Sequence, residues 1–146
     1  MSGAHGRSRT RQVALQALYQ WQLSGLSVAD IETQFKEDRD LSGVDRDYFR
    51  ELLREVTRRL SELDDHLAPI LDRPVEEVDP VERAILRLGT YELCHRPDVP
   101  YRVAINEAIG LAKTFGAEDG HKYVNGVLDR IARKVRAPEL ERRGSR

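Results

Sequence analysis

The stretch Val103–Ile131 reads VAINEAIGLAKTFGAEDGHKYVNGVLDRI and contains two segments whose apolar residues recur at helical spacing. The first set is Ala104, Ile105, Ala108, Ile109 and Ala112, and the second is Val124, Val127, Leu128 and Ile131. Spacing of i, i+3 and i+4 places such side chains on one stripe of a helix. The pattern therefore predicts two amphipathic helices joined by a turn at Thr114–Asp119.

Both predicted helices contain residues that packing alone does not favour. Asn106-Glu107 lies in the first helix and Asn125-Gly126 in the second. Glycine inside a helix costs about 1 kcal/mol relative to alanine, and an Asn-Gly pair normally forms a hairpin turn. We therefore expect a close backbone approach or a bound partner at these positions.

Helical patterns also account for the rest of the chain. We expect a first helix over Ser8–Ser24, ended by Gly25, and a second helix that begins after Ser27. The predicted core positions of the first helix are Val13, Ala14, Ala17, Leu18 and Trp21. An apolar stripe over residues 45–71 is longer than one typical globular helix, so we expect a break near Ser61.

Helix boundaries in the second half carry specific signals. Asp79-Pro80-Val81-Glu82 is a strong helix start, in which Asp79 caps the helix and Glu82 completes a capping box. Gly116 should end the next-to-last helix, and Asp119 is placed to cap the last one.

The sequence thus predicts an all-α fold, a compact bundle of six or seven helices with short connections. We expect a flexible basic N-terminus at residues 1–8, a single helical domain at residues 9–137, and a disordered basic tail at residues 138–146. Pro138 should end the last helix.

Composition limits the class of protein. The chain has 146 residues, of which 40% are hydrophobic and 34% charged, as is typical of one soluble domain. No apolar run reaches the ~20 residues of a membrane span, and the first residues, MSGAHGRSRTRQ, contain no signal core. The single cysteine, Cys94, forbids an internal disulfide or a cysteine-rich zinc site and suits a small buried role. We expect a cytoplasmic protein that does not contact membranes.

The net charge of −1 conceals an asymmetry. Residues 1–29 carry +3 and residues 130–146 carry +5, which leaves −9 on the middle of the chain. Basic ends around an acidic body suit a nucleic acid at the ends and a basic protein on the body. The alternative is that both ends are solvated tails.

The sequence contains no catalytic or metal-binding pattern. The histidines His5, His66, His95 and His121 do not have the spacing of metal ligands. There is also no nucleophile turn and no glycine-rich phosphate loop. We therefore expect no enzymatic activity, no metal and no cofactor.

One face of the first predicted helix has the chemistry of an RNA-binding surface. Arginine neutralises phosphate, amides pair with base edges, and an exposed ring stacks on bases. Arg9, Gln12, Gln16 and Tyr19 share a sector away from the core stripe, with Arg7 and Arg11 beside it. The alternative is a polar helix face whose Tyr19 is half-buried against a neighbour.

A second candidate surface surrounds the turn between the last two helices. Phe115 and Tyr123 bracket this turn, and Lys113 and Lys122 lie beside them. Aromatic rings interleaved with bases suit single-stranded RNA, whose unstacked bases can lie on rings. The alternative for Phe115 is a core plug beneath the loop, and the Asp119 carboxylate would weaken phosphate binding nearby.

An acidic cluster forms a third candidate surface, and its members are Glu76, Glu77, Asp79 and Glu82. It suits a basic protein partner, with charge setting the rate and orientation of association. The alternative is helix-start chemistry, since acids are favoured at the positive end of the helix dipole. The two interpretations are compatible.

Four stretches resemble the NusB family of bacterial proteins. They are ALQALYQWQL (Ala14–Leu23), VERAILRLGTYEL (Val81–Leu93), VPYRVAINEA (Val99–Ala108) and INEAIGLAKTFGAEDGHKYVNGVLD (Ile105–Asp129). The resemblance extends from about Arg7 to Arg133. It implies a compact all-helical protein built from two small bundles. The chain departs from the family at Gly120, where a small polar residue is usual, and at Tyr123, where phenylalanine is commoner.

The resemblance also implies a function in transcription antitermination. NusB-family proteins bind boxA, a short single-stranded RNA element of ribosomal RNA transcripts, together with the small-subunit ribosomal protein NusE. The complex joins RNA polymerase and other Nus factors and suppresses termination. The matching RNA-facing positions are Arg7, Arg9, Arg11, Gln16, Tyr19, Phe115 and Tyr123, to which we add Lys122 as a contact and Asp119 as a modulating residue. The matching NusE-facing positions are Tyr19, Glu76 and Glu82.

Two other hypotheses remain at this point. The main alternative is a self-associating helical module with little RNA affinity, in which a homodimer hides the RNA-facing side. A helix-turn-helix protein that binds duplex DNA is a more distant alternative.

Overall fold

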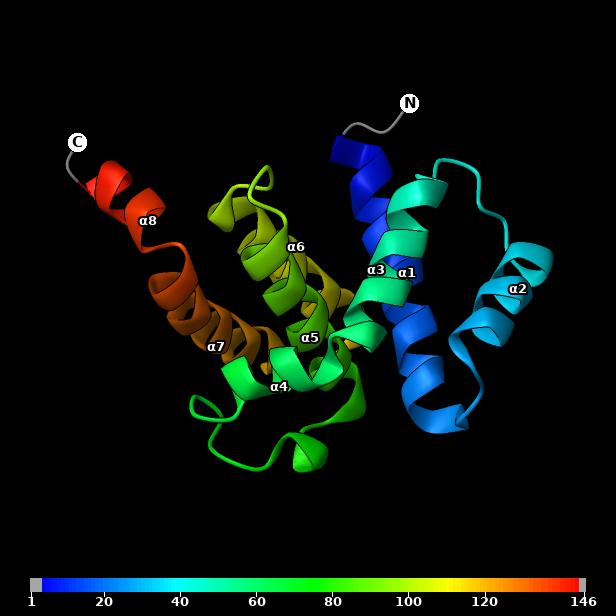
Figure 1. Cartoon of the computed structure of the whole chain (residues 1–146), viewed down its shortest axis with the longest axis horizontal. Helices are drawn as coiled ribbons and strands as arrows, with labels where there is room; N and C mark the ends of the chain where they lie inside the picture. Colours follow the sequence, from blue (N-terminus) through cyan, green and yellow to red (C-terminus); the bar gives the residue numbers. More distant parts are fainter. Residues whose placement is uncertain (1–3, 145–146) are drawn as a thin grey trace. The chain divides into compact units, whose positions relative to one another are not determined.

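The computed structural model describes residues 4–144, and the side chains of residues 7–141. Over this part of the chain the backbone forms eight α-helices and one 3₁₀ helix, without strands, which confirms the all-α prediction (Figure 1). The chain divides into two compact units, Met1–Leu60 and Ser61–Arg146. Each unit has its own set of mutually packed helices, as the two small bundles implied by the resemblance would have. The single domain expected at residues 9–137 stays a prediction.

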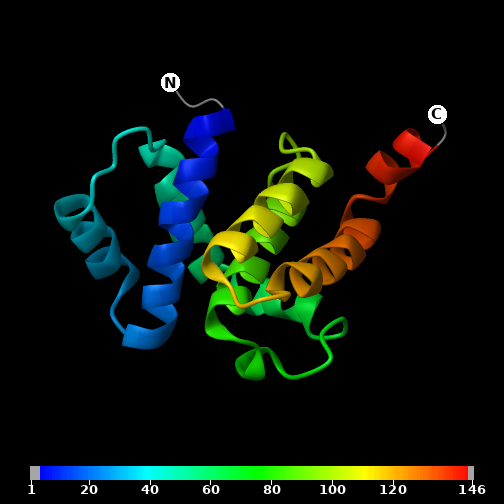
Figure 2. The same ribbon diagram turned by 180° about the vertical axis from the view of Figure 1, so that it is seen from behind.

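The first unit contains α1 (Ala4–Ser24), α2 (Val28–Asp38) and α3 (Arg46–Arg58), which pack against one another (Figure 2). Gly25 follows α1 with a φ of +74°, the left-handed conformation that ends many helices. The Ser27 hydroxyl accepts a hydrogen bond from the Asp30 backbone N–H at 3.1 Å and caps α2. Both predicted boundaries are confirmed.

The start of α1 differs from the prediction. The helix begins at Ala4 instead of Ser8, so residues 4–8 are helical where a flexible segment was expected. Side-chain contacts of Arg7 in this first part of the helix, described below, hold it in place. Residues 1–3 of the expected flexible segment lie outside the described residues.

The core of the first unit follows the predicted stripe of α1. Its buried members are Val13, Ala14, Ala17 and Leu18. Phe35 of α2 and Phe49 of α3 stack in the same core, with ring centroids 6.1 Å apart. Trp21, the fifth predicted core residue, is only half-buried because it lines an open groove.

The long stripe after Asp45 is broken as predicted, but at Arg59 instead of Ser61. Arg59 leaves helical geometry, with φ −99° and ψ 21°, and α4 (Leu60–Leu67) follows it. Just before the break, the Thr57 hydroxyl donates to the Leu53 carbonyl oxygen at 2.7 Å. Such back-bonding bends helices, which accounts for a break earlier than the sequence indicated.

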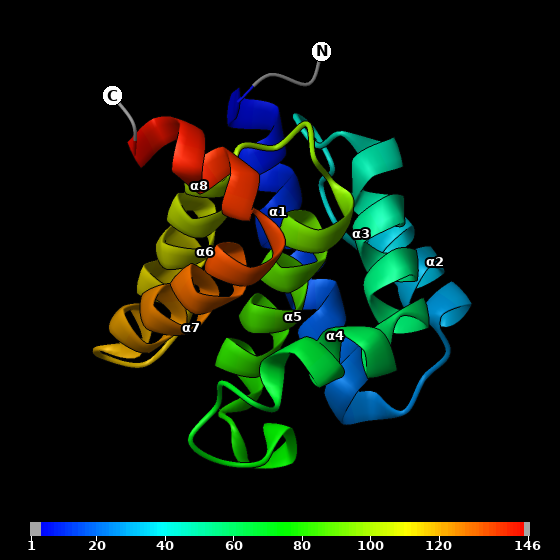
Figure 3. The same ribbon diagram turned by 60° about the vertical axis from the view of Figure 1, so that its left-hand side comes forward.

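The second unit continues with the 3₁₀ helix η1 (Val75–Glu77), α5 (Pro80–His95), α6 (Tyr101–Phe115), α7 (Gly120–Val135) and α8 (Ala137–Gly144). Helices α5, α6 and α7 pack against one another (Figure 3). The Asp79 carboxylate accepts hydrogen bonds from the backbone N–H groups of Val81 and Glu82 at 3.1 and 3.2 Å, so the predicted cap of α5 is confirmed.

Gly89 sets the distance between α5 and α7. A Cβ atom at this position would lie 2.7 Å from Cδ1 of Leu128. Glycine therefore lets the Leu128 side chain pack directly on the α5 backbone. This contact belongs to the core of the second unit, where both residues are buried.

The C-terminal segment is more ordered than predicted. Residues 137–144 form α8 where a disordered tail was expected from residue 138, and Pro138 lies in the first turn of this helix, a position that suits proline. The Glu139 carboxylate anchors the helix, because it accepts from the Arg136 guanidinium at 2.6 Å and from the Tyr101 backbone N–H at 3.0 Å. Residues 145–146 lie outside the described part of the chain.

Arg136 connects several backbone segments of the second unit. Only 8% of this residue is exposed. Its guanidinium donates to four carbonyl oxygens, those of Glu92, Leu93, Arg96 and Val99, at 2.8 to 3.2 Å. It thereby adds a donor to carbonyl oxygens at the end of α5 and in the connection that follows, where helix bonding leaves acceptors free. Two of these oxygens, those of Glu92 and Arg96, also accept from the backbone N–H groups of Arg96 and Val99.

Among residues 4–144, no helix is both long enough and apolar enough to cross a membrane. Within the same residues, no group of three or more His, Cys, Asp or Glu side chains is arranged to hold a metal ion. Cys94 is half-buried, and burial raises the pKa of its thiol to about 11. A thiol with that pKa is a poor nucleophile at neutral pH, in agreement with the packing role expected for it.

Candidate nucleic-acid interface

The first candidate surface lies on α1, and we call it the α1 surface. Its predicted members are Arg7, Arg9, Arg11, Gln16 and Tyr19. Arg7 lies over the ring of Tyr48 on α3, with its guanidinium carbon 4.3 Å from the ring centroid. Arg11 approaches the same ring at 5.9 Å and is only 3% exposed.

The environment of Arg11 therefore differs from the predicted one. The sequence placed it at the edge of an exposed face, whereas the structure places it among buried residues. The reason is tertiary, since the ring of Tyr48 offers a cation–π partner that α1 alone does not reveal. A direct contact between Arg11 and RNA remains a prediction, and its packing role is now evident.

Arg9 is exposed and holds the loop between α2 and α3. Its Nε donates to the Ser42 carbonyl oxygen and its Nη2 to the Asp40 carbonyl oxygen, both at 2.9 Å. Gly43 in this loop has a φ of +74°, and its Cβ position would lie 3.7 Å from Cδ of Arg9. The Arg9 guanidinium thus fixes a loop while remaining accessible to solvent.

Gln16 and Tyr19 complete the α1 surface. The Gln16 side-chain oxygen accepts a hydrogen bond from Arg39, whose guanidinium lies 4.6 Å from the Phe35 ring centroid. Tyr19 is 37% exposed, a value that fits both an RNA-facing ring and the partly covered ring of the alternative interpretation. Stacking of this ring on a base remains a prediction.

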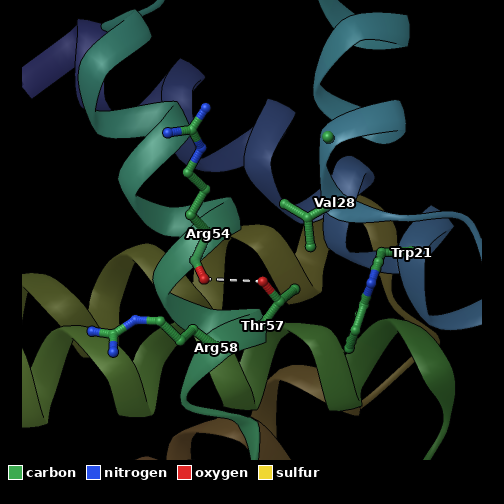
Figure 4. A pocket seen from close by; sticks show the side chains of 6 residues that line it. Trp21, Val28, Arg54, Thr57 and Arg58 are labelled. Carbon is green, nitrogen blue, oxygen red and sulfur yellow. Dashed lines mark hydrogen bonds between the residues drawn. The ribbon is translucent and has the colours of Figure 1, made fainter.

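An open groove of about 480 Å³ lies in the first unit and was not predicted. Its lining residues are Trp21, Val28, Ala29, Arg54, Thr57 and Arg58 (Figure 4). Arg54 pairs with both Glu32 oxygens at 2.9 and 3.1 Å, and Arg58 pairs with Glu55 at 2.6 Å. Because both guanidinium groups already face a carboxylate, the groove adds little attraction for phosphate.

The second candidate surface lies at the start of α7, and we call it the α7 surface. Its predicted members are Phe115, Lys122 and Tyr123. Phe115 is the last residue of α6 and is half-buried, so it is neither a fully buried plug nor a freely exposed ring. The Lys122 side chain is 73% exposed, and its Nζ lies 3.4 Å from the Asp119 carboxylate.

Asp119 was predicted to cap α7, but its side chain does not do so. It occupies the N-cap position, but its backbone is left-handed, with a φ of 66°, and its side chain accepts no capping hydrogen bond. The carboxylate faces Lys122 instead. Gly116, by contrast, ends α6 as predicted.

Tyr123 is held by two residues that the sequence did not single out. Its hydroxyl donates to Oδ1 of Asp72 at 3.3 Å, and the Arg73 guanidinium carbon lies 5.3 Å from its ring centroid. Burial, and then the negative charge of Asp72, raise the pKa of Tyr123. Asp72 and Arg73 are separated from Tyr123 by about 50 residues in the sequence, so no local spacing could have connected them.

Glu76 and Glu82, two members of the acidic cluster, lie in different environments. Glu76 is exposed, and its carbonyl oxygen accepts from Arg83 at 3.0 Å. Glu82 is half-buried, and burial together with the nearby Asp79 raises the pKa of its carboxyl. A Cβ atom at Gly120 would lie 2.5 Å from Oε2 of Glu82. The carboxylate thus lies against the first turn of α7, in the space that a Cβ atom at residue 120 would occupy.

Asn125 and Gly126 are exposed on α7, and Asn106 is exposed on α6. A Cβ atom at Gly126 would meet no atom of the described residues within 4 Å. The close backbone approach predicted as one explanation for this glycine is therefore not made within the described chain. A bound partner remains the other explanation.

Comparison with known proteins identifies the family. Residues 8–133, most of the chain, match the model of the NusB family. The chain belongs to the NusB family. The transcription antitermination protein NusB of Nitrosococcus oceani is 59% identical over 140 residues, which cover 96% of this chain and 94% of that protein. The NusB protein of Shewanella halifaxensis is 58% identical over 130 residues, which cover 89% of this chain and 96% of that protein.

Solved NusB structures share this fold. T. maritima NusB matches with a TM-score of 0.81 at 32% identity, over 97% of this chain and 99% of that chain. A chain from the crystal structure of the antitermination factors NusB and NusE in complex with dsRNA matches with a TM-score of 0.79 at 25% identity, over 90% of this chain and 99% of that chain. The resemblance to NusB and the all-helical fold that it implied are confirmed. Transcription antitermination, the function predicted from the resemblance, is the function for which the NusB relatives are named.

Proposed function

We propose that this chain is a cytoplasmic, non-catalytic antitermination factor that binds boxA-type single-stranded RNA of ribosomal RNA transcripts together with NusE and acts on RNA polymerase. The observation that carries this proposal is the 59% identity to the NusB protein of Nitrosococcus oceani over 96% of the chain. The likeness to a solved complex of NusB, NusE and dsRNA supports the RNA and the protein partner.

The α1 surface supplies one part of the RNA contact. Arg9 remains exposed while it holds the loop, and Tyr19 presents a ring to solvent. The two residues lie about 15 Å apart along α1, so the guanidinium can neutralise one phosphate while the ring stacks on the base of another nucleotide. Arg7 and Gln16 contribute from the same helix, and Arg11 supports them by packing under the ring of Tyr48.

The α7 surface supplies a second part. Lys122 extends into solvent and precedes the half-buried Tyr123 in the chain, and Phe115, also half-buried, ends α6. Asp119 modulates this surface, because its carboxylate pairs with Lys122 and competes with phosphate for the same ammonium group. Removal of that carboxylate should therefore favour RNA.

Glu76 and Glu82 of the second unit are proposed contacts of NusE, and Tyr19 of the first unit is proposed separately as another. The exposed Glu76 carboxylate suits a basic side chain of the partner, which would set orientation and association rate. Burial and then the nearby Asp79 raise the pKa of Glu82, and the positive charge of Arg73 offsets this only in part. A basic group from NusE would further favour the ionised carboxylate.

A titration of the full chain into fluorescently labelled boxA RNA, with and without NusE, tests the proposal. We expect binding of the single strand that NusE strengthens, with weaker binding to a scrambled strand and to a duplex of the same sequence. Equal affinity for all three RNAs would contradict boxA recognition. Light scattering of the same samples tests the alternative, because a stable dimer that RNA does not affect would favour a self-associating module.

A matched pair of variants assigns the surface. Lys122 and Arg133 both lie on α7, with side chains 73% and 70% exposed, and each pairs with an aspartate on the same helix turn. Lys122→Ala should weaken RNA binding and reduce the slope of log K against log salt by ~0.7, whereas Arg133→Ala should leave both unchanged. Equal effects of the two variants would remove the α7 surface from the interface.

A further inference from the structure

Three side chains of the second unit form a connected group that we call the Tyr123 cluster: Asp72, Arg73 and Tyr123. The Asp72 carboxylate accepts from Arg73 Nε at 2.8 Å and from Arg73 Nη2 at 3.0 Å. Its Oδ1 also accepts from the Tyr123 hydroxyl at 3.3 Å. The same guanidinium lies 5.3 Å from the centroid of the Tyr123 ring. The carboxylate thus positions the arginine against the ring.

The cluster is not part of the hydrophobic core. The Arg73 and Asp72 side chains are 47% and 65% exposed. Ion pairs between exposed side chains contribute little to folding, because water solvates both charges and ordering costs side-chain entropy. Folding alone therefore gives no strong reason to hold a guanidinium against this ring.

The position of the cluster relative to the α7 surface suggests a role in binding. Tyr123 is the ring on which a base is proposed to stack, and Lys122 is its neighbour in the chain. Arginine is well suited to this environment, since its planar guanidinium can stack on a ring and bind a phosphate with the same group. In the structure, however, the fork of Arg73 that would bind a phosphate is directed at Asp72.

The charges of the pair oppose each other at neutral pH. The Arg73 guanidinium holds the pKa of Asp72 below its usual range, and Asp72 raises the pKa of Arg73. Both side chains are therefore ionised, and together they offer RNA no net positive charge. A phosphate that approaches Arg73 must displace a carboxylate of the same sign as its own.

We propose that Arg73 is a further RNA-contacting residue, which binds a phosphate of the strand stacked on Tyr123, and that Asp72 restrains it until RNA displaces the carboxylate. This inference rests on the proposed function, because it concerns the same single-stranded RNA at the α7 surface. It adds two residues, and it assigns them opposite effects on affinity.

Asp72→Asn tests the restraint. The amide keeps the size of the side chain but no longer carries the charge that holds Arg73. Affinity for labelled boxA RNA should rise about fivefold at 0.1 M salt, because the phosphate no longer has to displace a carboxylate to reach Arg73. Arg73→Ala should weaken binding, and Arg73→Ala combined with Asp72→Asn should show no gain over Arg73→Ala alone.

Asp98→Asn is the matched control. Asp98 also forms a two-point pair with an arginine, Arg96, at 2.9 and 2.8 Å, and its side chain is 56% exposed. The two aspartate variants change the net charge equally, so a gain confined to Asp72→Asn identifies the cluster. Equal gains would show that net charge alone is responsible and would overturn the inference.

The outcomes separate the inference from the proposed function. If the unaltered chain binds boxA RNA but Asp72→Asn brings no gain, the restraint is wrong and the function stands. If no form of the protein binds boxA RNA, with or without NusE, both are overturned. Thermal unfolding of each variant should match that of the unaltered chain, and the Arg73 Nε–Hε signal in NMR spectra should shift when RNA is added.

Discussion

The α1 surface and the α7 surface contain similar residue types but use them differently. On α1, two arginines lie against the ring of Tyr48 and a third binds loop carbonyl groups. On α7, Lys122 extends into solvent and pairs only loosely with Asp119. A basic residue on a helix face can thus stabilise its own unit or remain available to a ligand. The α1 surface is proposed to combine both roles, whereas we expect that Lys122 of the α7 surface can be replaced without loss of stability.

Replacing a buried charged residue of the first unit, Glu32, should have the largest effect on stability. Only 7% of the Glu32 side chain is exposed, and it pairs with Arg54 at 2.9 Å and Lys36 at 3.0 Å. Glu32→Ala should lower the free energy of unfolding by about 2–3 kcal/mol, because it leaves these cations without their acceptor. Urea denaturation at pH 7 measures this, and an unchanged midpoint would show that the network is dispensable.

The pH dependence of stability gives a second measurement on Glu32. Burial alone would raise the pKa of its carboxyl, but hydrogen bonds from Arg54 and Lys36 outweigh burial and lower the pKa. The carboxylate therefore contributes stability that is present above the ordinary pKa of 4.5 and is lost as pH falls through the lower folded value. The difference between Glu32→Ala and the unaltered chain should shrink in that acidic range.

Arg11→Ala should have the next largest effect. We expect a loss of about 2 kcal/mol in unfolding free energy, because the buried stem and guanidinium pack beside Tyr48. Its RNA affinity should be compared only after stability is measured. Lys122→Ala is the control from the α7 surface and should leave the urea midpoint unchanged. If Arg11→Ala is as stable as the control, the proposed difference between the surfaces is wrong.

Gly126→Ala should raise stability. The Cβ position is open and the residue lies within a helix, so alanine should add about 0.5–1 kcal/mol to the free energy of unfolding. Gly89→Ala is the internal contrast, since its Cβ would lie 2.7 Å from Leu128 and it should destabilise the second unit. If Gly126→Ala also weakens binding of RNA or NusE, a partner that approaches the α7 backbone explains the glycine.

Glu82→Gln should have the smallest effect on the free energy of unfolding. It should raise this free energy, whereas Glu32→Ala should lower it. Burial, with Asp79 nearby, raises the folded pKa of Glu82 above 4.5, so ionisation costs stability as pH rises through that folded value. The amide should therefore be slightly more stable than the unaltered chain at pH 7, and the difference should disappear below pH 4.5. Thermal unfolding across pH measures both, and greater stability of the unaltered chain at pH 7 would contradict the assignment.

Local sequence signals predicted most of the helices, because periodicity and caps act over a few residues. Gly25, Ser27 and Asp79 each mark a boundary that the structure confirms. The tail was mispredicted because α8 depends on a distant anchor, the bond between Glu139 and the Tyr101 backbone.

The candidate surfaces were less predictable than the helices. A helical wheel places Arg11 beside an exposed face, but the ring that covers it belongs to α3. Asp72 and Arg73 carry no spacing signal toward Tyr123, since tertiary folding alone brings them together. Sequence reasoning therefore finds candidate residue types, whereas the structure shows which of them already have partners.

Arg136 has a consequence for how the chain tolerates shortening from its carboxyl end. Its guanidinium donates hydrogen bonds to backbone carbonyl oxygens at the end of α5 and in the connection that follows. Stepwise deletion should consequently show a threshold and not a gradual decline. Chains that retain residue 136 keep four hydrogen bonds to these carbonyl groups, whereas chains that stop before it lose all four together. Protease resistance should therefore fall abruptly at that single step.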